Sequence, residues 1–368
     1  MNEKTQPCTH CGAVHPRVNL TWMGSAELCP ECLQRYTVCC DCCGERIWMA
    51  NDYGTHYLHL CASCRADNYV TCENCGALIP QEDAHYNDED EAYCDSCYER
   101  GYGGTIHNYS YKPEPIFYGD GPLYLGVELE VDEAGKDNIN AVQALRAFNQ
   151  ENVYGYVKSD GSLNDGFELV THPCTLETHL QQVPWRETLE ALRGMGYRSH
   201  APGTCGLHVH VSRKALGKDV YEQEKTIAKL LYIFERFWQE ILRFSRRTES
   251  QINHWAARYG YKDRGEEILK EAKHGANGRY ACINLTNTDT IEFRVFRGTL
   301  KYNTVIATLQ FVANLCRVAI SLPEYRIQEF SWPALIEALT QDNCPELVQY
   351  LKELNLYVNE PVTAEREV

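Results

Sequence analysis

Polar and apolar residues alternate in several short stretches of the chain after residue 122. From Leu123 to Val131 the odd positions are leucine or valine, and the even positions include Glu128 and Glu130. Alternation with a period of two predicts a β-strand with one apolar and one polar face, so both glutamates lie on the polar face. The purpose of two carboxylates on that face depends on what neighbouring strands offer.

Later stretches show the same alternation. GFELVT, GLHVHVS and TIEFRVFRGTL each read as a strand with an apolar and a polar face, and RYACINLT is expected to form a further short strand. The polar positions of these strands are Glu168, His208, His210, Ser212, Glu292 and Arg294, with Arg297 near the end of the last strand.

Between the expected strands, apolar residues recur at helical spacing. The longest such pattern runs from Lys218 to Arg247, and a row of apolar residues along it is typical of a helix that buries one face. Further helices are expected at residues 137–149, 303–322, 335–339 and 346–354. Mostly antiparallel strands with helices inserted between them predict an α+β fold.

The expected polar face differs from an ordinary solvated sheet face, which mixes threonine, serine, lysine and glutamine. It carries glutamate, histidine and arginine instead. Buried carboxylates without partners would be strongly destabilising, so we expect them to meet cations. Carboxylate oxygens with an imidazole suit Mg²⁺ or Mn²⁺, and arginines suit a phosphate or a carboxylate. We therefore favour a metal–phosphate site over an amphipathic sheet surface.

Cysteine is concentrated at the start of the chain, where 14 of the 19 cysteines precede residue 100. The stretches CTHCG, CDCCG and CENCG begin 32 residues apart, and a second C-x2-C pair follows each of them. Two tight turns that each offer two thiolates are typical of a tetrahedral zinc site. The expected ligands are Cys8, Cys11, Cys29 and Cys32, then Cys40, Cys43, Cys61 and Cys64, then Cys72, Cys75, Cys94 and Cys97.

The second repeat has two further cysteines, Cys39 and Cys42, which the period leaves outside the tetrad. His56, His59 or His85 could replace a thiolate, although each is expected to be a loop residue. Without a recognisable secretion signal, paired cysteines more often bind metal than form disulfides, so we favour zinc over a disulfide framework. Four protein ligands leave no open position, so about three Zn²⁺ ions are expected to stabilise the fold rather than to catalyse.

Charge argues against nucleic acid as a partner. The net charge is −16, and the first hundred residues hold 16 acidic and 6 basic residues. Nucleic-acid binding depends mainly on neutralising phosphates with lysine and arginine. We therefore interpret the zinc modules as structural or as a surface that recruits a protein partner.

The sequence predicts three parts. Residues 1–100 form three tandem zinc modules, residues 101–122 form a Gly/Tyr-rich linker, and residues 123–368 form the second domain. The chain starts without an apolar signal segment, and no uninterrupted run reaches the roughly 18 apolar residues of a membrane span. We expect a cytoplasmic protein with no membrane contact.

The ordered stretches GVELEV, DGSL with GFELVTHP, GLHVHVS and IEFRVFRGTL resemble the amidoligase family, which comprises carboxylate–amine ligases related to glutamine synthetase and glutamate–cysteine ligase. The resemblance covers roughly Tyr124 to Leu315. It implies a curved antiparallel sheet that forms a funnel with helices outside, and ATP with divalent ions (Mg²⁺ or Mn²⁺) on the concave face. It also implies that a carboxylate is activated as an acyl phosphate and is then attacked by an amine.

Carried over residue by residue, the resemblance gives metal-binding roles to Glu128, Glu130, Glu168, His210 and Glu292. It implies that His208 lies at the nucleotide and that Arg294 and Arg297 bind the transferring phosphate, so these arginines and Glu292 take part in catalysis. The stretch D-G-S is similar to a loop whose aspartate receives a proton from the amine. Asp160 is then the candidate base, with Ser162 near the nucleotide, although D-G-S also suits an ordinary turn.

Other functions remain open from the sequence. The same polar face could serve a metal-dependent hydrolase or a phosphotransferase, and a non-enzymatic zinc adaptor is a third possibility. The chain has neither a G-x-x-x-x-G-K-[ST] loop nor a G-x-G-x-x-G fingerprint, so neither motif accounts for nucleotide binding. Cys174, Cys205 and Cys282 are expected to be buried rather than catalytic. The motifs do not say whether the acid and amine are small molecules, peptides or proteins.

Overall fold

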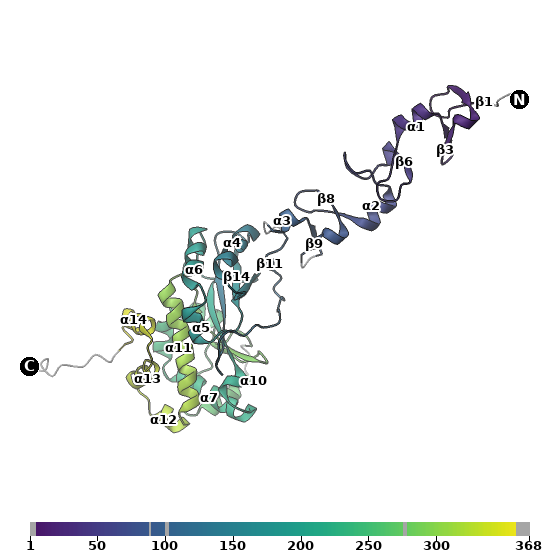
Figure 1. Cartoon of the computed structure of the whole chain (residues 1–368). Helices are drawn as coiled ribbons and strands as arrows, with labels where there is room; N and C mark the ends of the chain where they lie inside the picture. Colours follow the sequence, from purple (N-terminus) through teal and green to yellow (C-terminus); the bar gives the residue numbers. More distant parts are fainter. Residues whose placement is uncertain (1–4, 88–89, 100–102, 275–277, 358–368) are drawn as a thin grey trace, which may run out of the picture. The chain divides into compact units, whose positions relative to one another are not determined.

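The computed structural model describes residues 5–87, 90–99, 103–274 and 278–357 of the chain, which divides into two compact units (Figure 1). The first unit comprises Met1–Gly104 and the second comprises Thr105–Val368. The division falls inside the segment 101–122, for which the sequence predicts a linker.

The first unit consists of short hairpins, each followed by a short helix. Its elements are β1 Thr5–Pro7, β2 Val14–Pro16, β3 Thr21–Met23, β4 Ala26–Leu28, α1 Pro30–Tyr36, β5 Thr37–Cys39, β6 Arg46–Trp48, α2 Ala62–Asn68, β7 Tyr69–Thr71, β8 Leu78–Pro80, β9 His85–Tyr86, β10 Ala92–Tyr93 and α3 Asp95–Glu99. The pairs β1/β2, β5/β6 and β7/β8 are the same hairpin in three successive modules.

Each module has a small core built around its cysteines. Leu28 and Leu60 are fully buried in the first two cores, and Ile79 is buried in the third. The cores of the first and second modules are each covered by an apolar side chain from the module that follows. Trp48 from the second module packs against the first core, and Leu78 from the third module packs against the second core.

Seven strands of the second unit form one sheet in the order β11-β13-β14-β12-β15-β17-β16. Their bounds are β11 Ile106–His107, β12 Leu125–Val131, β13 Gly155–Lys158, β14 Phe167–Thr171, β15 Gly206–Ser212, β16 Ile283–Asn284 and β17 Thr290–Arg297. The four strands with clear alternation in the sequence are neighbours at the centre of this sheet.

The pairing confirms an α+β fold and corrects one detail. Among the described residues of this seven-stranded sheet, five of the six strand pairings are antiparallel, and β11 pairs with β13 in parallel. The sheet is therefore mixed, because residues that follow the division at Gly104 add a parallel edge strand. The funnel shape stays a prediction.

Helices cover the apolar face of the sheet (Figure 1). Their bounds are α4 Asn138–Phe148, α5 Leu176–Gln181, α6 Trp185–Gly194, α7 Val220–Arg236, α8 Trp238–Ser245, α9 Glu249–Trp255, α10 Gly265–His274, α11 Tyr302–Ser321, α12 Glu324–Gln328, α13 Trp332–Leu339 and α14 Pro345–Glu353. The odd-numbered residues of β12 pack with α7 and α11 in one continuous core. Burial of this face leaves the even-numbered residues of β12 on the opposite face.

The segment 218–247 is two helices rather than the single helix that the pattern predicts. Phe237 leaves the helical conformation with φ −106° and ψ 35°, which ends α7 and starts α8. Arg246 then ends α8 in the left-handed conformation, with φ 62°. A residue with a Cβ rarely adopts this conformation outside a functional or tightly constrained position.

By length and composition, helix α11 is long and apolar enough to cross a membrane. However, 83% of its most apolar 18-residue stretch is buried inside the second unit. It contacts helices α5, α7, α13 and α14. These contacts make α11 the central core helix of this unit.

Candidate active site

Strand pairing places the predicted polar residues in rows across the sheet. Glu130 of β12 lies opposite Glu168 of β14, and Glu128 lies opposite His208 of β15. His210 lies opposite Glu292 of β17. Residues directly opposite one another in neighbouring strands point to the same face, so the structure brings together the groups that alternation assigned to the polar face.

Two groups of these side chains could each hold a cation. Glu128, His210 and Glu292 offer ligand atoms that lie within 4.8 Å of one another, and so do Glu128, Glu168 and His208. The Glu128 carboxylate lies 3.2 Å from Nε2 of His210 and 3.4 Å from Nδ1 of His208. Ligand atoms around a divalent ion at about 2.1 Å are about 3 Å apart, so these separations fit a shared ion. Glu128 belongs to both groups.

One ring nitrogen of His210 faces this carboxylate group. Nδ1 lies 3.2 Å from Oγ1 of Thr290, which directs Nε2 toward Glu128. Nε2 is buried and makes no hydrogen bond of acceptable geometry within the described part of the chain. Burial opposes charge on the imidazole, but the Glu128 carboxylate outweighs burial and raises the pKa of His210. A buried imidazole nitrogen directed at carboxylates suits a metal ligand.

The remaining carboxylates repel one another. Burial, followed by the charge of Glu128, raises the pKa of Glu168 well above its usual value, and burial also raises the pKa of Glu130. Nζ of Lys158 lies 3.3 Å from Glu168, and both side chains are more than nine-tenths buried. A divalent ion would stabilise the charged form of each carboxyl, because a nearby positive charge favours the carboxylate.

A β-bulge determines where the arginines of β17 point. Val209 of β15 faces Phe293, whereas Leu207 faces Phe296, so β17 has one extra residue at this point. A bulge shifts the alternation of side chains by one position. Arg297 consequently lies opposite Gly206, on the polar face, although strict alternation would place it on the apolar face.

Arg246 and Arg247 follow α8 and add positive charge near Arg294 and Arg297 of β17. Arg247 is only 6% exposed, and burial lowers its pKa to about 10, which the nearby Glu130 carboxylate partly opposes. The Nε atoms of Arg246, Arg247, Arg294 and Arg297 are buried without a hydrogen-bond partner in the residues that the structure describes. Buried donors are normally paired, so the cluster suits an anion such as a phosphate.

Gly206 leaves room for this arrangement. A Cβ at position 206 would lie 2.3 Å from Nε2 of His208 and 2.9 Å from Nη2 of Arg247. The backbone N–H of Gly206 also donates a hydrogen bond to Glu130. A glycine is therefore needed where the carboxylate, imidazole and guanidinium groups meet.

The D-G-S stretch forms a turn directly after β13. The backbone N–H of Ser162 donates to Oδ1 of Asp160 at 2.7 Å, and the hydroxyl of Ser162 donates to the same oxygen. The Asp160 charge contributes to raising the pKa values of Glu130 and Glu168, so Asp160 lies within electrostatic range of the carboxylate group. A local turn and a position at the edge of the site are thus both observed.

The cysteines predicted as zinc ligands gather into three groups of four, with the membership that the repeat predicts. The Sγ–Sγ distances between the two pairs are 3.9 Å for Cys11 and Cys29, 3.9 Å for Cys43 and Cys61, and 3.8 Å for Cys75 and Cys94. Tetrahedral zinc with Zn–S bonds of about 2.3 Å requires about 3.8 Å between sulfurs. The tetrads therefore have the dimensions of four-cysteine zinc sites.

The first turn of each tetrad favours the thiolate form of its first cysteine, Cys8, Cys40 or Cys72. Gly12, Gly44 and Gly76 have φ values of 75°, 75° and 72°, which glycine adopts without strain. The backbone N–H of Cys11 is the main cause that lowers the pKa of Cys8 to about 6, and the N–H of Cys61 does the same for Cys40. Thiolates are the form that binds zinc.

The alternative zinc ligands do not enter these groups. His59 pairs with Asp52, with 2.5 Å between Nδ1 and Oδ2, and His85 pairs with Asp95 at 2.7 Å. Cys39 and Cys42 are exposed and lie outside the second tetrad.

Comparison with known proteins agrees with the resemblance seen in the sequence. A family described as putative amidoligase enzyme has a profile that matches residues 146–316. This region of the chain is amidoligase-like. The matched region contains β14, β15 and β17 but begins after β12, so Glu128 and Glu130 lie outside it. No curated protein matches the chain.

Solved structures of two ligases are also similar. A bifunctional glutathione synthetase from Pasteurella multocida matches with 15% identity and a TM-score of 0.31, over 63% of this chain and 46% of that one. The complex between prokaryotic ubiquitin-like protein Pup and its ligase PafA matches with 12% identity and a TM-score of 0.27, over 57% of this chain and 51% of that one. The chain thus spans about half the length of each of these structures.

Three residues of the amidoligase-like region join the site without having been predicted. Lys158 is on the four-residue strand β13, where alternation with Tyr156 was too short to recognise. Asn284 donates a hydrogen bond to Glu292 at 2.8 Å from the short strand β16. Arg247 follows the helical pattern of α8, and no local signal separates it from a surface arginine.

The cysteines of the second unit are buried, as expected. Burial raises the pKa values of Cys174 and Cys205 to about 12. Burial also raises the pKa of Cys282. These thiols remain protonated near neutral pH, so they are unsuited to act as nucleophiles.

Proposed function

We propose that the second unit is an ATP- and Mg²⁺-dependent carboxylate–amine ligase that forms an amide or isopeptide bond through an acyl phosphate. The observation that carries the proposal is the meeting, at one sheet face, of two cation-binding groups with Arg294 and Arg297 of β17 and the buried Arg247, whose Nε atoms are buried without a hydrogen-bond partner among the described residues. The amidoligase family match over residues 146–316 supports the same class of reaction.

The donors suit hard divalent cations. Carboxylate oxygens from three glutamates and two imidazole nitrogens form the two groups, and this mixture fits Mg²⁺ or Mn²⁺. Glu128, Glu168, Glu292, His208 and His210 would hold the ions, and Glu130 lies beside them. Such ions neutralise the triphosphate and polarise its γ-phosphoryl group.

The arginines provide the second half of the proposed site. Arg294 and Arg297 come from β17, and Arg247 approaches from the end of α8. Their fixed, buried N–H groups would stabilise the negative charge on the phosphoryl oxygens during transfer, because preorganised donors in a dry site are effective there. Arg294 also forms an ion pair with Glu292, so the proposed phosphate-binding and cation-binding groups are in direct contact.

The proposed reaction has two steps. An oxygen of the substrate carboxylate attacks the γ-phosphorus of ATP, ADP leaves, and an acyl phosphate forms. The amine nitrogen then attacks the acyl carbon, inorganic phosphate leaves, and an amide remains. The amine must lose a proton in the second step, and Asp160 at the edge of the carboxylate group is the proposed base.

We propose that the zinc modules recruit a protein or peptide partner. Several apolar side chains of the first module are exposed, including Val14 at 65%, Val18 at 83% and Trp22 at 61%. These exposed apolar side chains would provide contact area for a partner. The acidic charge of this part of the chain makes nucleic acid an unsuitable partner.

The test uses purified full-length protein with zinc, ATP and Mg²⁺, incubated with cell lysate and then analysed by mass spectrometry for products that have lost one water. We expect release of ADP and phosphate together with such products. Glu128→Gln should abolish both, because Glu128 belongs to both cation groups. Glu151→Gln is the matched control, since Glu151 is exposed, lies in a loop and belongs to neither cation group.

Each outcome has a defined meaning. Condensation products that persist in Glu128→Gln would reject the site. Products that form without nucleotide, or phosphate found stably on a guanidino or hydroxyl acceptor, would favour the hydrolase or phosphotransferase alternative. Absence of ATP binding in calorimetry would favour the adaptor alternative.

A further inference from the structure

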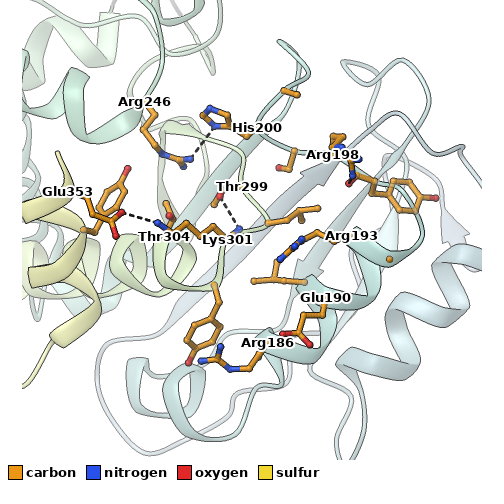
Figure 2. Close-up of a pocket in the computed structure, with 18 of the residues that line it drawn as sticks. Arg186, Glu190, Arg193, Arg198, His200, Arg246, Thr299, Lys301, Thr304 and Glu353 are labelled. Carbon is orange, nitrogen blue, oxygen red and sulfur yellow. Dashed lines mark hydrogen bonds and ion pairs between the residues drawn. The ribbon is translucent and has the colours of Figure 1, made fainter.

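A second cavity, separate from the carboxylate–imidazole groups, lies at the end of α6 and near the start of α11 (Figure 2). Its volume is about 1220 Å³. The wall is formed by α6, the segment 197–201, the segment 299–304 and the end of α14. None of the proposed cation ligands lines it. We define this as the basic cavity.

The charge of the basic cavity is opposite to that of the chain. Its charged lining residues are the cations Arg186, Arg193, Arg198, Arg246 and Lys301 and the anions Glu190 and Glu353. Positive charge thus predominates here, whereas the whole chain carries −16. Figure 2 shows Arg193 and Arg246 on opposite sides of the cavity, with Lys301 between them. A cavity lined in this way attracts anions.

Only part of this positive charge is used within the protein. Lys301 forms an ion pair with Glu353 at 2.9 Å, and the Arg186 guanidinium lies 4.0 Å from the ring centre of Tyr302. Arg246 contacts His200 at 3.2 Å, and its Nε is buried without a hydrogen-bond partner among the described residues. Arg193 has no side-chain hydrogen bond or ion pair with any residue that the structure describes.

The spacing of the arginines on α6 favours an extended ligand. Arg186, Glu190 and Arg193 all line the cavity at intervals of four and three residues, so they share one face of the helix. Seven residues of helix separate the backbone positions of Arg186 and Arg193 by about 10 Å along the axis. A peptide in the polyproline II conformation has three residues per turn and rises about 3.1 Å per residue, so carboxylates three residues apart lie on the same side and about 9 Å apart. A triphosphate is more compact than this separation.

The cavity reaches the proposed active site at one wall. Ser199 lines it and donates a hydrogen bond of 2.7 Å to the carbonyl oxygen of Glu130. Arg246 donates to the carbonyl oxygen of Arg297 at 2.8 Å. A peptide bound in the cavity would therefore lie next to the proposed phosphate-binding part of the active site.

We propose that the basic cavity binds an acidic peptide segment with carboxylates about three residues apart. We assign this peptide to the substrate that the ligase acts on. Its role as a substrate rests on the proposed function above, whereas binding of the peptide does not. Tyr302, Tyr350 and Leu354 in the lining would contact the aliphatic parts of its side chains.

The binding test uses the full-length zinc-loaded protein and a fluorescein-labelled peptide, Glu-Gly-Gly-Glu-Gly-Gly-Glu, in an anisotropy titration. We expect saturable binding that weakens with salt, and no binding of the Gln-Gly-Gly-Gln-Gly-Gly-Gln peptide. Arg193→Gln should weaken binding about fivefold, and adding Arg186→Gln should weaken it further. Arg146→Gln on α4 is the control, because Arg146 is exposed and outside the cavity.

Several results would overturn the proposal. One is equal binding of the glutamine peptide. A second is an equal loss of affinity in Arg146→Gln, and a third is tight binding of inorganic tripolyphosphate at the cavity with no binding of the acidic peptide. Thermal unfolding of each variant checks that the exposed substitutions leave the fold intact. Glu128→Gln should remove ligation and leave peptide binding unchanged. In the unsubstituted chain, peptide binding without ligation would count only against the proposed function, and ligation without peptide binding would count only against the basic cavity.

Discussion

The buried pair Lys158 and Glu168 gives the sharpest stability prediction. Nζ of Lys158 lies 3.3 Å from Oε2 of Glu168, and their side chains are 9% and 3% exposed. With an effective dielectric constant of about 20, the attraction at this distance is about 5 kcal/mol. Lys158→Met leaves Glu168 beside Glu128 and Glu130 without its cation. Removing one partner of a buried pair typically costs about 3–5 kcal/mol, and uptake of a proton by Glu168 limits the loss, so we expect about 3 kcal/mol.

The assay is urea unfolding followed by tryptophan fluorescence at pH 7, with and without MgCl2. Four of the six tryptophans, Trp185, Trp238, Trp255 and Trp332, report on the second unit. The double variant Lys158→Met/Glu168→Gln should recover at least half of the loss, because it removes the unpaired charge. Mg²⁺ should stabilise Lys158→Met more than the original chain, since an ion bound to the folded state shifts the unfolding equilibrium.

The dependence on pH gives a further check. The folded-state pKa of Glu168 is raised above its unfolded value, so folding favours the protonated carboxyl, and stability falls as pH rises between the two values. Lys158→Met removes a cation that lowers the pKa of Glu168, so it should extend this fall to higher pH. A variant that unfolds at the same urea concentration as the original chain at pH 7, or that gains nothing from Mg²⁺, would refute this account of the acidic group.

Three other predictions follow from single positions. Cys40→Ser should lower the zinc content from about three to about two ions per chain by elemental analysis, whereas Cys39→Ser should leave it unchanged. Gly206→Ala should reduce ATP turnover by at least about tenfold, because its Cβ would lie 2.3 Å from a histidine nitrogen, whereas a Cβ in Gly121→Ala meets only an ordinary 3.5 Å contact with Thr175 and this variant should be silent. Asp132→Ala should cost about 2 kcal/mol at pH 7 by urea unfolding. The peptide N–H groups around Asp132 hold its pKa below the usual value against burial, so this cost should shrink as pH falls below about 4.

Much of the polar face could be predicted from the sequence because β12, β14 and β15 follow a regular period of two. Regular alternation fixes which residues share a face without knowledge of the partner strand. It does not fix which strands are neighbours, and strand pairing alone brings Glu128 opposite His208.

The rest of the site depends on irregular features. Arg297 reaches the polar face through a bulge in β17, and a bulge has no reliable sequence signal. Arg247 follows the left-handed residue Arg246, which ends α8 at Ser245, whereas the apolar pattern predicts a helix that includes Arg247. Lys158 comes from a strand of four residues, which is too short for alternation to stand out. Tertiary contacts decide these three positions.

The apolar side chains that link neighbouring zinc modules come from the later module, so the modules depend on one another in one direction along the chain. Trp48 packs against the core of the first module, and Leu78 packs against that of the second, so the first two modules each depend on the fold of the module that follows. Stripping the metal from the third tetrad with a chelator should loosen the two modules before it in turn. Loss of the ion from the first tetrad should leave the second and third modules folded. Unfolding should therefore spread from a module that has lost its metal toward the amino terminus.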